Sequence, residues 1–230
     1  MIIKGLQKLT LLDFPGRIAC TIFTYGCNLR CPFCHNASLV RSEGAREPDY
    51  TEDEILSFLN NRKGRLEGVC ITGGEPTLMP DLIPFMRRIR DMGFAIKLDT
   101  NGYRPDVLRR VIDEGLCDYV AMDIKNAPDK YPLTTGIPSL DIERIKESVA
   151  LLKEGRVPFE FRTTVMRELH TEEDLINIAK WLGEDVSYYL QSYADSGDIL
   201  CGEFTAYSPE GMRSLAEAVR RHLPRVELRG

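Results

Sequence analysis

The sequence lacks the long hydrophobic runs that export or a membrane would require. No stretch approaches the roughly 20 apolar residues of a transmembrane helix, and the opening MIIKGLQKLTLLDFPGRI has no apolar run of signal-peptide length. It also lacks an excess of basic residues. The formal net charge is −5, so there is no positive field for wrapping nucleic acid. We therefore expect a cytoplasmic protein with neither a membrane nor a nucleic acid as partner.

Cysteine occurs in an odd number and is unevenly distributed. Three of the seven cysteines fall within residues 27–35, which read CNLRCPFCH. Because a cytosolic compartment keeps thiols reduced, the clustered three are interpreted as ligands or catalysts rather than as disulfide partners. The others stand alone and are interpreted as packing residues: Cys20, Cys70, Cys117 and Cys201.

The cysteine loop, residues 27–35, fits four kinds of site. Cys31, Cys34 and His35 match the C-x-x-C-H pattern of covalent haem, and the two cysteines alone match a dithiol redox motif. Together with Cys27, the same residues could form a Cys₃His zinc site. Alternatively, the three thiolates could hold three irons of a four-iron cluster.

Apolar segments rich in β-branched residues alternate with segments of helical spacing. At 230 residues and 43% apolar, the chain can bury the core of one domain. The predicted strands are 18–24, 68–72, 94–99, 118–124, 158–165 and 186–191. The predicted helices are 51–62, 80–92, 105–114, 140–154, 171–182 and 209–222. Thr51 and Glu54 predict a capping box at the start of the first helix.

Repeated strand–helix units predict a parallel sheet with right-handed crossovers. Six units are fewer than the eight of a closed barrel. We therefore predict an α/β fold, an incomplete (βα)6 TIM-like barrel of parallel strands, as a single domain over residues 1–230. Residues 1–17 form an N-terminal extension in this prediction. A doubly wound open sheet is the alternative, because the order of strands cannot be read from one sequence.

The cysteine loop begins just past the first predicted strand. In parallel α/β sheets, ligands collect at the C-terminal ends of the strands, which favours a functional site here. Haem attachment would need export, zinc would need the adjacent Cys34 and His35 to face one ion, and a dithiol leaves Cys27 unexplained. The C-x₃-C-x₂-C spacing favours a four-iron cluster in which one iron has no protein ligand and is open to a substrate.

Polar motifs follow the next three predicted strands, and a basic residue lies in the fifth. Residues 73–76 (GGEP) contain paired glycines that allow close backbone approach to a ligand. Residues 99–102 read DTNG, and Asp123 and Lys125 alternate by two, so both face the same side of their strand. An acid and a base held together suit a zwitterionic ligand, and Arg162 could add a cation. Taken singly, each motif also fits a turn or a solvated loop.

These motifs resemble those of the radical S-adenosylmethionine (SAM) enzymes, whose signature is C-x₃-C-x-Φ-C, with Phe33 here as the aromatic residue. The resemblance implies one [4Fe-4S] cluster held by Cys27, Cys31 and Cys34, with its open iron chelated by SAM. It further implies that the reduced cluster passes an electron to the sulfonium. The S–C5′ bond then breaks, and the resulting 5′-deoxyadenosyl radical abstracts a hydrogen from a substrate.

Within this superfamily, the sequence is similar to the activating enzymes of glycyl radical proteins. The segments that carry the similarity are LLDFPG, CHN, TGGEP, DTNG and MDIK. They are similar to the anaerobic ribonucleoside-triphosphate reductase activating proteins and to pyruvate formate-lyase activating enzyme. Residues 190–193 read LQSY where the latter has L-P-F-H, and CHNAS stands for the usual CHNPE. The resemblance implies a glycyl radical enzyme as protein substrate and a flavodoxin- or ferredoxin-type electron donor.

The resemblance also assigns roles to the polar motifs. Glu75 and its two preceding glycines would bind the methionyl amino group, and the acids would contribute to a monovalent cation site near Asp99, Thr100 and Asp123. The implied SAM contacts are Phe33, Gly73, Gly74, Glu75, Asp99, Asn101, Asp123, Lys125 and Arg162.

Three functions remain in competition. An activase would abstract a glycine Cα hydrogen from a partner protein, whereas a small-molecule enzyme would act on a substrate such as a nucleobase precursor. An iron–sulfur electron carrier would leave the GGEP, DTNG and MDIK motifs without a purpose. We favour the activase, because a short open barrel leaves room for a peptide loop and no long C-terminal lid is expected after residues 209–222.

Overall fold

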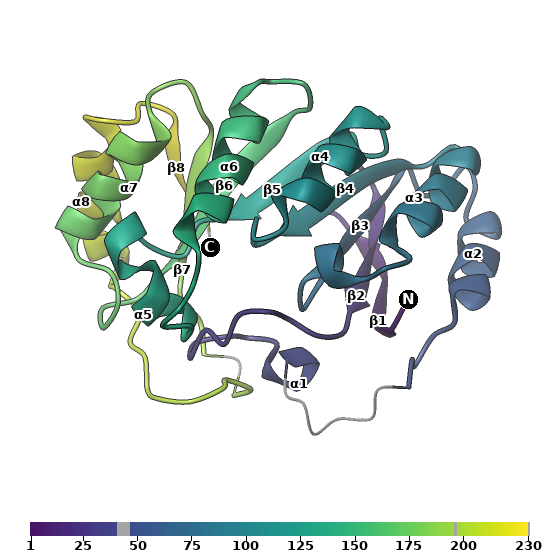
Figure 1. The fold of residues 1–230 in the computed structure, drawn as a ribbon, viewed down its shortest axis with the longest axis horizontal. Helices are drawn as coiled ribbons and strands as arrows, with labels where there is room; N and C mark the ends of the chain where they lie inside the picture. Colours follow the sequence, from purple (N-terminus) through teal and green to yellow (C-terminus); the bar gives the residue numbers. More distant parts are fainter. Residues whose placement is uncertain (41–46, 196, 230) are drawn as a thin grey trace.

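The strands form one open sheet whose spatial order is the order of the chain (Figure 1). The computed structural model describes residues 1–40, 47–195 and 197–229. Over these ranges β1 runs antiparallel to β2, every later pair is parallel, and β1 and β8 are the two edges. The strands are β1 (Ile3–Thr10), β2 (Ala19–Thr24), β3 (Gly68–Gly73), β4 (Ala95–Thr100), β5 (Tyr119–Asp123), β6 (Phe159–Val165), β7 (Tyr188–Ser192) and β8 (Val226–Arg229).

The longer helices that connect the parallel strands lie along the outer side of the sheet, whereas the short α1 and α5 lie at the end that carries the cysteine loop (Figure 1). The α-helices are α1 (Ala37–Val40), α2 (Glu52–Asn60), α3 (Leu82–Asp91), α4 (Pro105–Asp113), α5 (Tyr131–Thr135), α6 (Ile142–Lys153), α7 (Glu172–Leu182) and α8 (Pro209–Arg220). Two 3₁₀ turns, η1 (Pro76–Leu78) and η2 (Pro128–Lys130), complete the helical elements of the described chain. The capping box of Thr51 and Glu54 begins α2 as predicted. In the described ranges, no helix is long and apolar enough to cross a membrane.

The predicted incomplete parallel barrel is confirmed. All six predicted strands correspond to β2–β7, and the six predicted helices correspond to α2, α3, α4, α6, α7 and α8. Because each strand pairs with its neighbours in the sequence, the strand-order reversal of a doubly wound sheet is excluded. The structure adds β1, which lies within residues 1–17, and the short β8. Both are edge strands that the prediction did not include.

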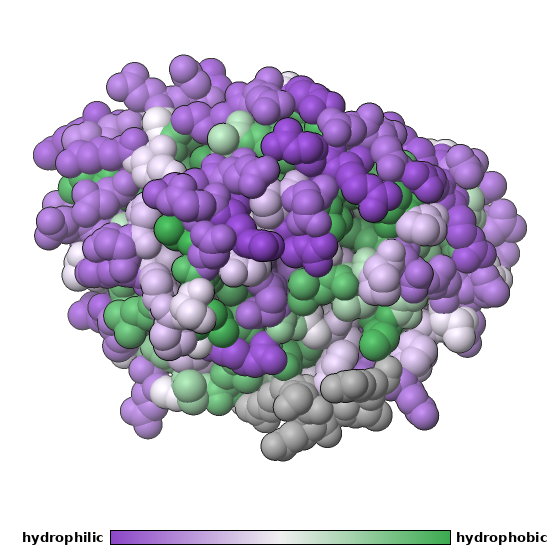
Figure 2. Space-filling model, in the orientation of Figure 1, coloured by the Kyte–Doolittle hydropathy of each residue, from purple (hydrophilic) through white to green (hydrophobic). Residues whose placement is uncertain are grey.

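Alternate residues on each strand separate an apolar face from a polar one. On β4, Ile96 and Leu98 are fully buried in the hydrophobic core, whereas Lys97 and Asp99 point to the opposite face. The outer surface is mostly hydrophilic where helices cover the sheet (Figure 2). The core thus lies between helices and sheet, and the inner face is left for charged groups.

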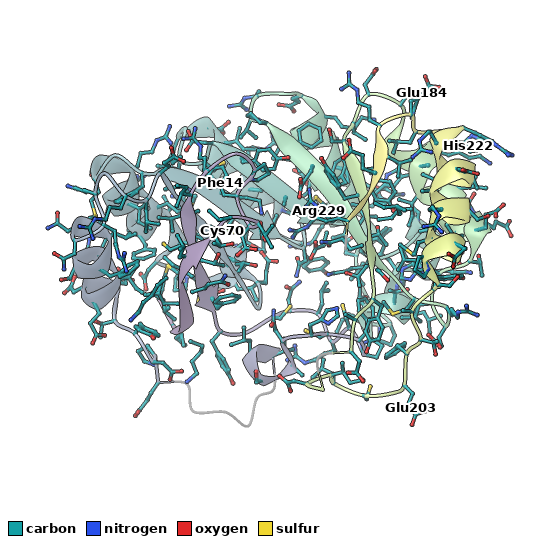
Figure 3. The ribbon with its side chains drawn as sticks, turned by 180° about the vertical axis from the view of Figure 1, so that it is seen from behind. Phe14, Cys70, Glu184, Glu203, His222 and Arg229 are labelled. Atoms are coloured by element: carbon teal, nitrogen blue, oxygen red, sulfur yellow. The ribbon has the colours of Figure 1, made fainter. Side chains whose placement is uncertain are left out.

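Side chains pack together near the N-terminal ends of β2 and β4. Phe14, in the turn after β1, is 2% exposed and packs with Ala19 and Ala95. Across the sheet, Arg229 of β8 pairs with the buried carboxylate of Glu160 at 2.7 Å. Figure 3 shows Phe14 on the half nearest β1 to β3, with Arg229 on the other half. The cavity described below lies at the opposite, C-terminal end of β3 to β6.

Candidate active site at the C-terminal ends of the strands

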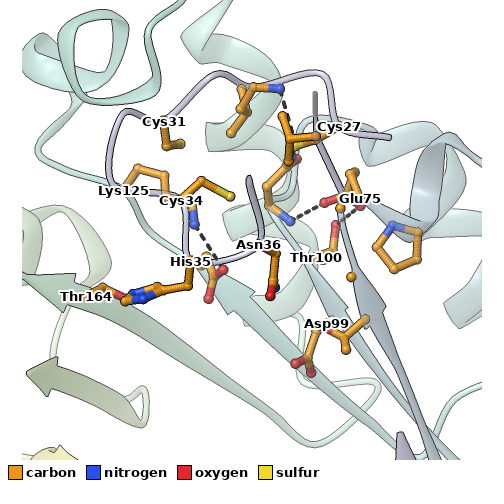
Figure 4. Close-up of a pocket in the computed structure, with 18 of the residues that line it drawn as sticks. Cys27, Cys31, Cys34, His35, Asn36, Glu75, Asp99, Thr100, Lys125 and Thr164 are labelled. Carbon is orange, nitrogen blue, oxygen red and sulfur yellow. Dashed lines mark hydrogen bonds and ion pairs between the residues drawn. The ribbon is translucent and has the colours of Figure 1, made fainter. Parts of the chain in front are cut away.

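One cavity collects every residue that the sequence predicted for the site (Figure 4). It lies between the cysteine loop and the C-terminal ends of β3 to β6, and encloses about 760 Å³ of empty space including its mouth. The predicted residues that line it are Cys27, Cys31, Phe33, Cys34, Gly73, Gly74, Glu75, Asp99, Asn101, Asp123, Lys125 and Arg162.

The cysteine loop is anchored by backbone hydrogen bonds to three separate parts of the fold. The N–H of Glu75 donates to the carbonyl of Gly26 at 2.8 Å, which joins the loop to the end of β3. The N–H of Arg30 donates to the carbonyl of Thr135 in α5 at 2.9 Å. Farther along, the Pro32 carbonyl accepts from the N–H of Leu200 at 3.1 Å. The cysteine positions are therefore set by the backbone of the barrel.

The paired glycines after β3 are required by the close approach of the cysteine loop. A Cβ at Gly74 would lie 2.1 Å from the carbonyl oxygen of Gly26, and one at Gly73 would lie 2.3 Å from the backbone nitrogen of Thr24. Gly73 also has a φ of 120°, which other residues rarely adopt. The sequence predicted that a ligand would approach these glycines closely; in the structure, the backbone of residues 24–26 does so.

The cysteine side chains face the cavity in a largely buried setting. Cys31 is 7% exposed, and Cys27 and Cys34 are partly buried. Burial raises the pKa of the Cys27 thiol to about 12 and that of Cys31 to about 11, although the charge of Lys125 acts to lower both. A metal bound here must displace these protons, because the thiolate is the ligand form.

Three cysteine side chains at one cavity fit the donor set of a four-iron cluster. Over the described residues, no group of three or more His, Cys, Asp or Glu side chains is arranged to hold one metal ion. A four-iron cluster places each thiolate on a different iron, so its sulfurs need only surround a shared cavity. The side-chain nitrogen of Asn28 is buried without a hydrogen-bond partner, and Asn101 contacts the Cys27 sulfur at 3.8 Å. Such donors are compatible with the additional sulfur acceptors of a cluster.

Charged side chains from the end of β5 and from the neighbouring β6 meet beneath the cysteines. Asp123 accepts from Lys125 Nζ at 3.0 Å and from Arg162 Nε at 3.0 Å. Burial by itself would raise the pKa of Asp123, but Lys125 and Arg162 hold it well below its usual range. In turn, Asp123 raises the pKa of Lys125 above its ordinary value against the opposing effect of burial. The site therefore keeps these groups ionised.

Glu75 is locked into the protein. It is 1% exposed, and its carboxylate accepts from Thr100 Oγ1 at 2.7 Å, from the N–H of Asn101 at 2.6 Å and from both donors of Thr77. Burial raises the pKa of Glu75, and these hydrogen bonds partly offset the rise. The carboxylate ties β3, η1 and the end of β4 together, so its observed contacts are structural.

Two buried residues that sequence reasoning missed hold the backbone of Lys125. Tyr131 Oη accepts from the Lys125 N–H at 3.1 Å, and His170 Nε2 lies 2.8 Å from the Lys125 carbonyl. The N–H of Met166 donates to His170 Nδ1, which leaves the proton on Nε2 to donate to that carbonyl. Neither residue belongs to a local motif, so no signal in the sequence marked them.

The connection between β7 and α8 covers part of the cysteine loop. Phe204 packs edge-on against Phe33 with ring centroids 6.1 Å apart, and Tyr193 lies 5.4 Å from the ring of His35. The N–H groups of Leu200 and Cys201 both bond the Pro32 carbonyl. The sequence analysis considered a lid only after α8 and expected an open site. The segment that covers part of the cysteine loop comes before α8.

Comparison with known proteins agrees with this geometry. The model of the radical SAM superfamily matches residues 21–182. The putative glycyl-radical enzyme activating enzyme MJ1227 of Methanocaldococcus jannaschii is 31% identical over 235 residues, which cover 99% of this chain and 95% of that protein. The pyruvate formate-lyase-activating enzyme of Clostridium pasteurianum is 32% identical over 140 residues, 58% of this chain and 57% of that enzyme.

Solved structures share the fold. The crystal structure of Streptococcus suis SuiB bound to S-adenosylmethionine superimposes with a TM-score of 0.71 at 15% identity, covering 90% of this chain and 49% of SuiB. The chain therefore spans about half the length of that protein. The matched family implies a [4Fe-4S] cluster and SAM as cofactors. From its sequence, fold and site, the chain belongs to the radical SAM superfamily.

Proposed function

We propose that the protein activates a glycyl radical enzyme by abstracting a hydrogen from a glycine Cα of that partner. The cluster and SAM together would supply the 5′-deoxyadenosyl radical that takes this hydrogen. In this proposal, residues 1–230 act as one radical SAM domain, with residues 1–17 as an extension that adds β1 to the sheet. The observation that carries the proposal is the single cavity in which the cysteine loop meets the polar ends of the strands.

The cysteines would hold the cluster, and their surroundings would control it. Cys27, Cys31 and Cys34 would each bind one iron and leave the fourth for SAM. Phe33 is 4% exposed and packs into the core, so its role would be to fix the loop between two ligands. Asn101 would donate a hydrogen bond toward Cys27, as its 3.8 Å contact suggests.

The charged strand ends would bind the methionyl part of SAM. Lys125 is 19% exposed at the cavity and Arg162 is 14% exposed, so both cations can contact a carboxylate while staying paired with Asp123. Asp99 would act through Arg162. The backbone of Gly73 and Gly74 would receive the amino group, with Glu75 positioning that turn rather than binding the ligand itself.

Chemistry and comparison both support a glycine in a protein as the substrate. A glycine radical is delocalised over the flanking amides, and the Cα has no side chain to block approach. MJ1227, which matches nearly the whole chain, carries the activating-enzyme name. A flavodoxin- or ferredoxin-type protein would supply the electron.

Deuterium transfer tests the substrate class. A co-purified partner protein is produced in cells supplied with glycine deuterated at Cα. The anaerobically reduced, cluster-loaded protein is incubated with SAM and this labelled partner, and the 5′-deoxyadenosine formed is analysed by mass spectrometry. We expect deuterium in 5′-deoxyadenosine together with a carbon-centred doublet in the EPR spectrum of the partner. Absence of this deuterium, with label transferred instead from a deuterated nucleobase or other metabolite supplied in a parallel incubation, would contradict the activase proposal and favour a small-molecule substrate.

A further inference from the structure

A buried lysine lies directly beneath the candidate SAM site. Lys97 precedes Asp99 by two residues on β4, so both side chains share the inner face of the strand. Its side chain is 2% exposed, and its ammonium contacts Asp99 Oδ1 and lies 3.9 Å from the Cys70 sulfur. Lysine is almost never fully buried unless it is paired. The pairing with Asp99 therefore accounts for its place in the fold.

Every carboxylate oxygen of Asp99 and Asp123 contacts a basic side chain. Lys97 takes Oδ1 of Asp99, and Arg162 contacts Oδ2 of Asp99 at 3.3 Å through both terminal nitrogens. Arg162 Nε donates to Oδ1 of Asp123, and Lys125 takes Oδ2. Three cations thus face two carboxylates, and the network carries one positive charge in excess.

These contacts do not fit the monovalent cation that the sequence resemblance implied. Such an ion would need free oxygens on Asp99, Thr100 and Asp123. The carboxylates are already paired, and Thr100 Oγ1 donates to Glu75 at 2.7 Å while accepting from the Gly102 N–H at 3.1 Å. Ammonium and guanidinium groups already contact each carboxylate oxygen that such an ion would share.

We propose that Lys97 is a fixed internal cation that replaces a monovalent metal ion at this site. By neutralising Asp99, it frees the charge of Arg162 to serve Asp123 and a bound carboxylate. Lys97 does not line the cavity, so it is a positioning residue rather than a ligand contact. The inference rests on the proposed SAM site, and it predicts that SAM binding by this protein needs neither sodium nor potassium.

Calorimetric titration of SAM into the cluster-loaded protein tests this inference. The titration is run in potassium, sodium and tetramethylammonium chloride at equal ionic strength. For the unmodified protein, we expect the same dissociation constant in the three salts within about twofold, a difference well below 1 kcal/mol. Lys97→Met should weaken binding in tetramethylammonium by roughly tenfold, about the loss of one charge-assisted contact, and potassium or sodium should recover part of it. Lys146→Met, which removes an exposed lysine paired with Glu143, is the matched control and should match the unmodified protein.

The outcomes separate this inference from the proposed function. If the unmodified protein binds SAM only with potassium or sodium, the SAM site stands and the internal cation is contradicted. If it binds no SAM in any salt, both fail. Salt-dependent recovery in Lys97→Met would not follow from misfolding. If that variant cannot be loaded with a cluster, the comparison of salts on the unmodified protein still shows whether SAM binding needs sodium or potassium. Equal affinity of a folded Lys97→Met in all salts would also overturn the role of Lys97.

Discussion

The carbonyl oxygen of Gly26 accepts a hydrogen bond from the N–H of Glu75, and this contact leaves no space for a side chain at Gly74, the residue before Glu75. The start of the cysteine loop and the turn after β3 therefore form one rigid unit. Since Cys27 follows Gly26 directly, the position of the first proposed iron ligand depends on the absence of a side chain at Gly74.

Gly74→Ala should displace the cysteine loop. Its Cβ would lie 2.1 Å from backbone oxygen, which cannot rotate away as a side chain could. We expect a loss of stability of about 3 kcal/mol, at the upper end of the usual cost of overpacking, and reduced iron content after reconstitution. Gly211→Ala in α8, whose Cβ would lie 3.3 Å from the Tyr207 ring, is the control. Chemical denaturation and iron analysis provide the measurements; a fully loaded, equally stable Gly74→Ala would refute the steric argument.

Lys125→Met should weaken SAM binding without removing the cluster. The change deletes one charge-assisted hydrogen bond, which costs about 1.5–3 kcal/mol, or roughly 10- to 150-fold in affinity. Asp123 keeps Arg162 as a partner, so no buried charge is left unpaired. Calorimetric titration of the loaded variant measures the effect, with Lys146→Met as the control. An unchanged affinity would place the methionyl group elsewhere.

His170 should make the protein less stable as the pH falls. Burial lowers the pKa of His170 in the folded protein below its ordinary value of 6.5. As the pH falls below 6.5, this histidine is therefore protonated more fully in the unfolded chain than in the folded protein, which favours unfolding. Its stabilising effect is thus complete above pH 6.5 and is lost progressively as the pH drops toward the lowered pKa. His170→Gln should flatten the fall in denaturation free energy between about pH 7 and 5.

Some pH dependence should remain in that variant, because burial also lowers the pKa of His35. The His222→Gln variant, in which the substituted histidine lies outside the cavity, is the control for the substitution itself. Identical pH profiles for the His170→Gln variant and the unmodified protein would show that His170 is not the group that titrates.

The elements of the barrel were predictable because each carries a complete local pattern. β2 to β7 are apolar and β-branched, and the longer helices between them have regular apolar spacing. Side-chain caps mark the starts of α2, α6 and α7. β1 is half-exposed and antiparallel, and β8 has four residues, so neither shows the pattern of a buried strand. The order of the strands in the sheet could not be predicted from local sequence patterns either, since it depends on how the elements pack.

The site was predictable where residues belong to compact motifs. The cysteine spacing and the strand-end motifs could be recognised singly, and the fold brought them to one cavity. By contrast, Lys97 lies in an ordinary strand, and His170 lies 45 residues from the carbonyl it contacts. The partners of Glu75 likewise come from β4. Such roles arise from tertiary neighbours, which no short segment encodes.

The cysteine variants should separate the proposed ligands from the packing cysteines. Cys27→Ala, Cys31→Ala and Cys34→Ala should each prevent assembly of a cluster of about four irons, because a thiolate ligand is lost. Cys117→Ala, at a buried position outside the cavity, should retain full iron content. Iron and sulfide analysis after anaerobic reconstitution measures the result. Full loading of any of the three ligand variants would contradict the assignment of that cysteine.

The most direct test of the central claim is the low-temperature EPR spectrum of the reconstituted, reduced protein before and after addition of SAM. If Cys27, Cys31 and Cys34 hold a four-iron cluster with one open iron, the spectrum will show a single reduced [4Fe-4S] species, and its g values will shift when SAM binds that iron. A protein that takes up zinc but no iron, or a cluster signal that SAM leaves unchanged, would contradict the account.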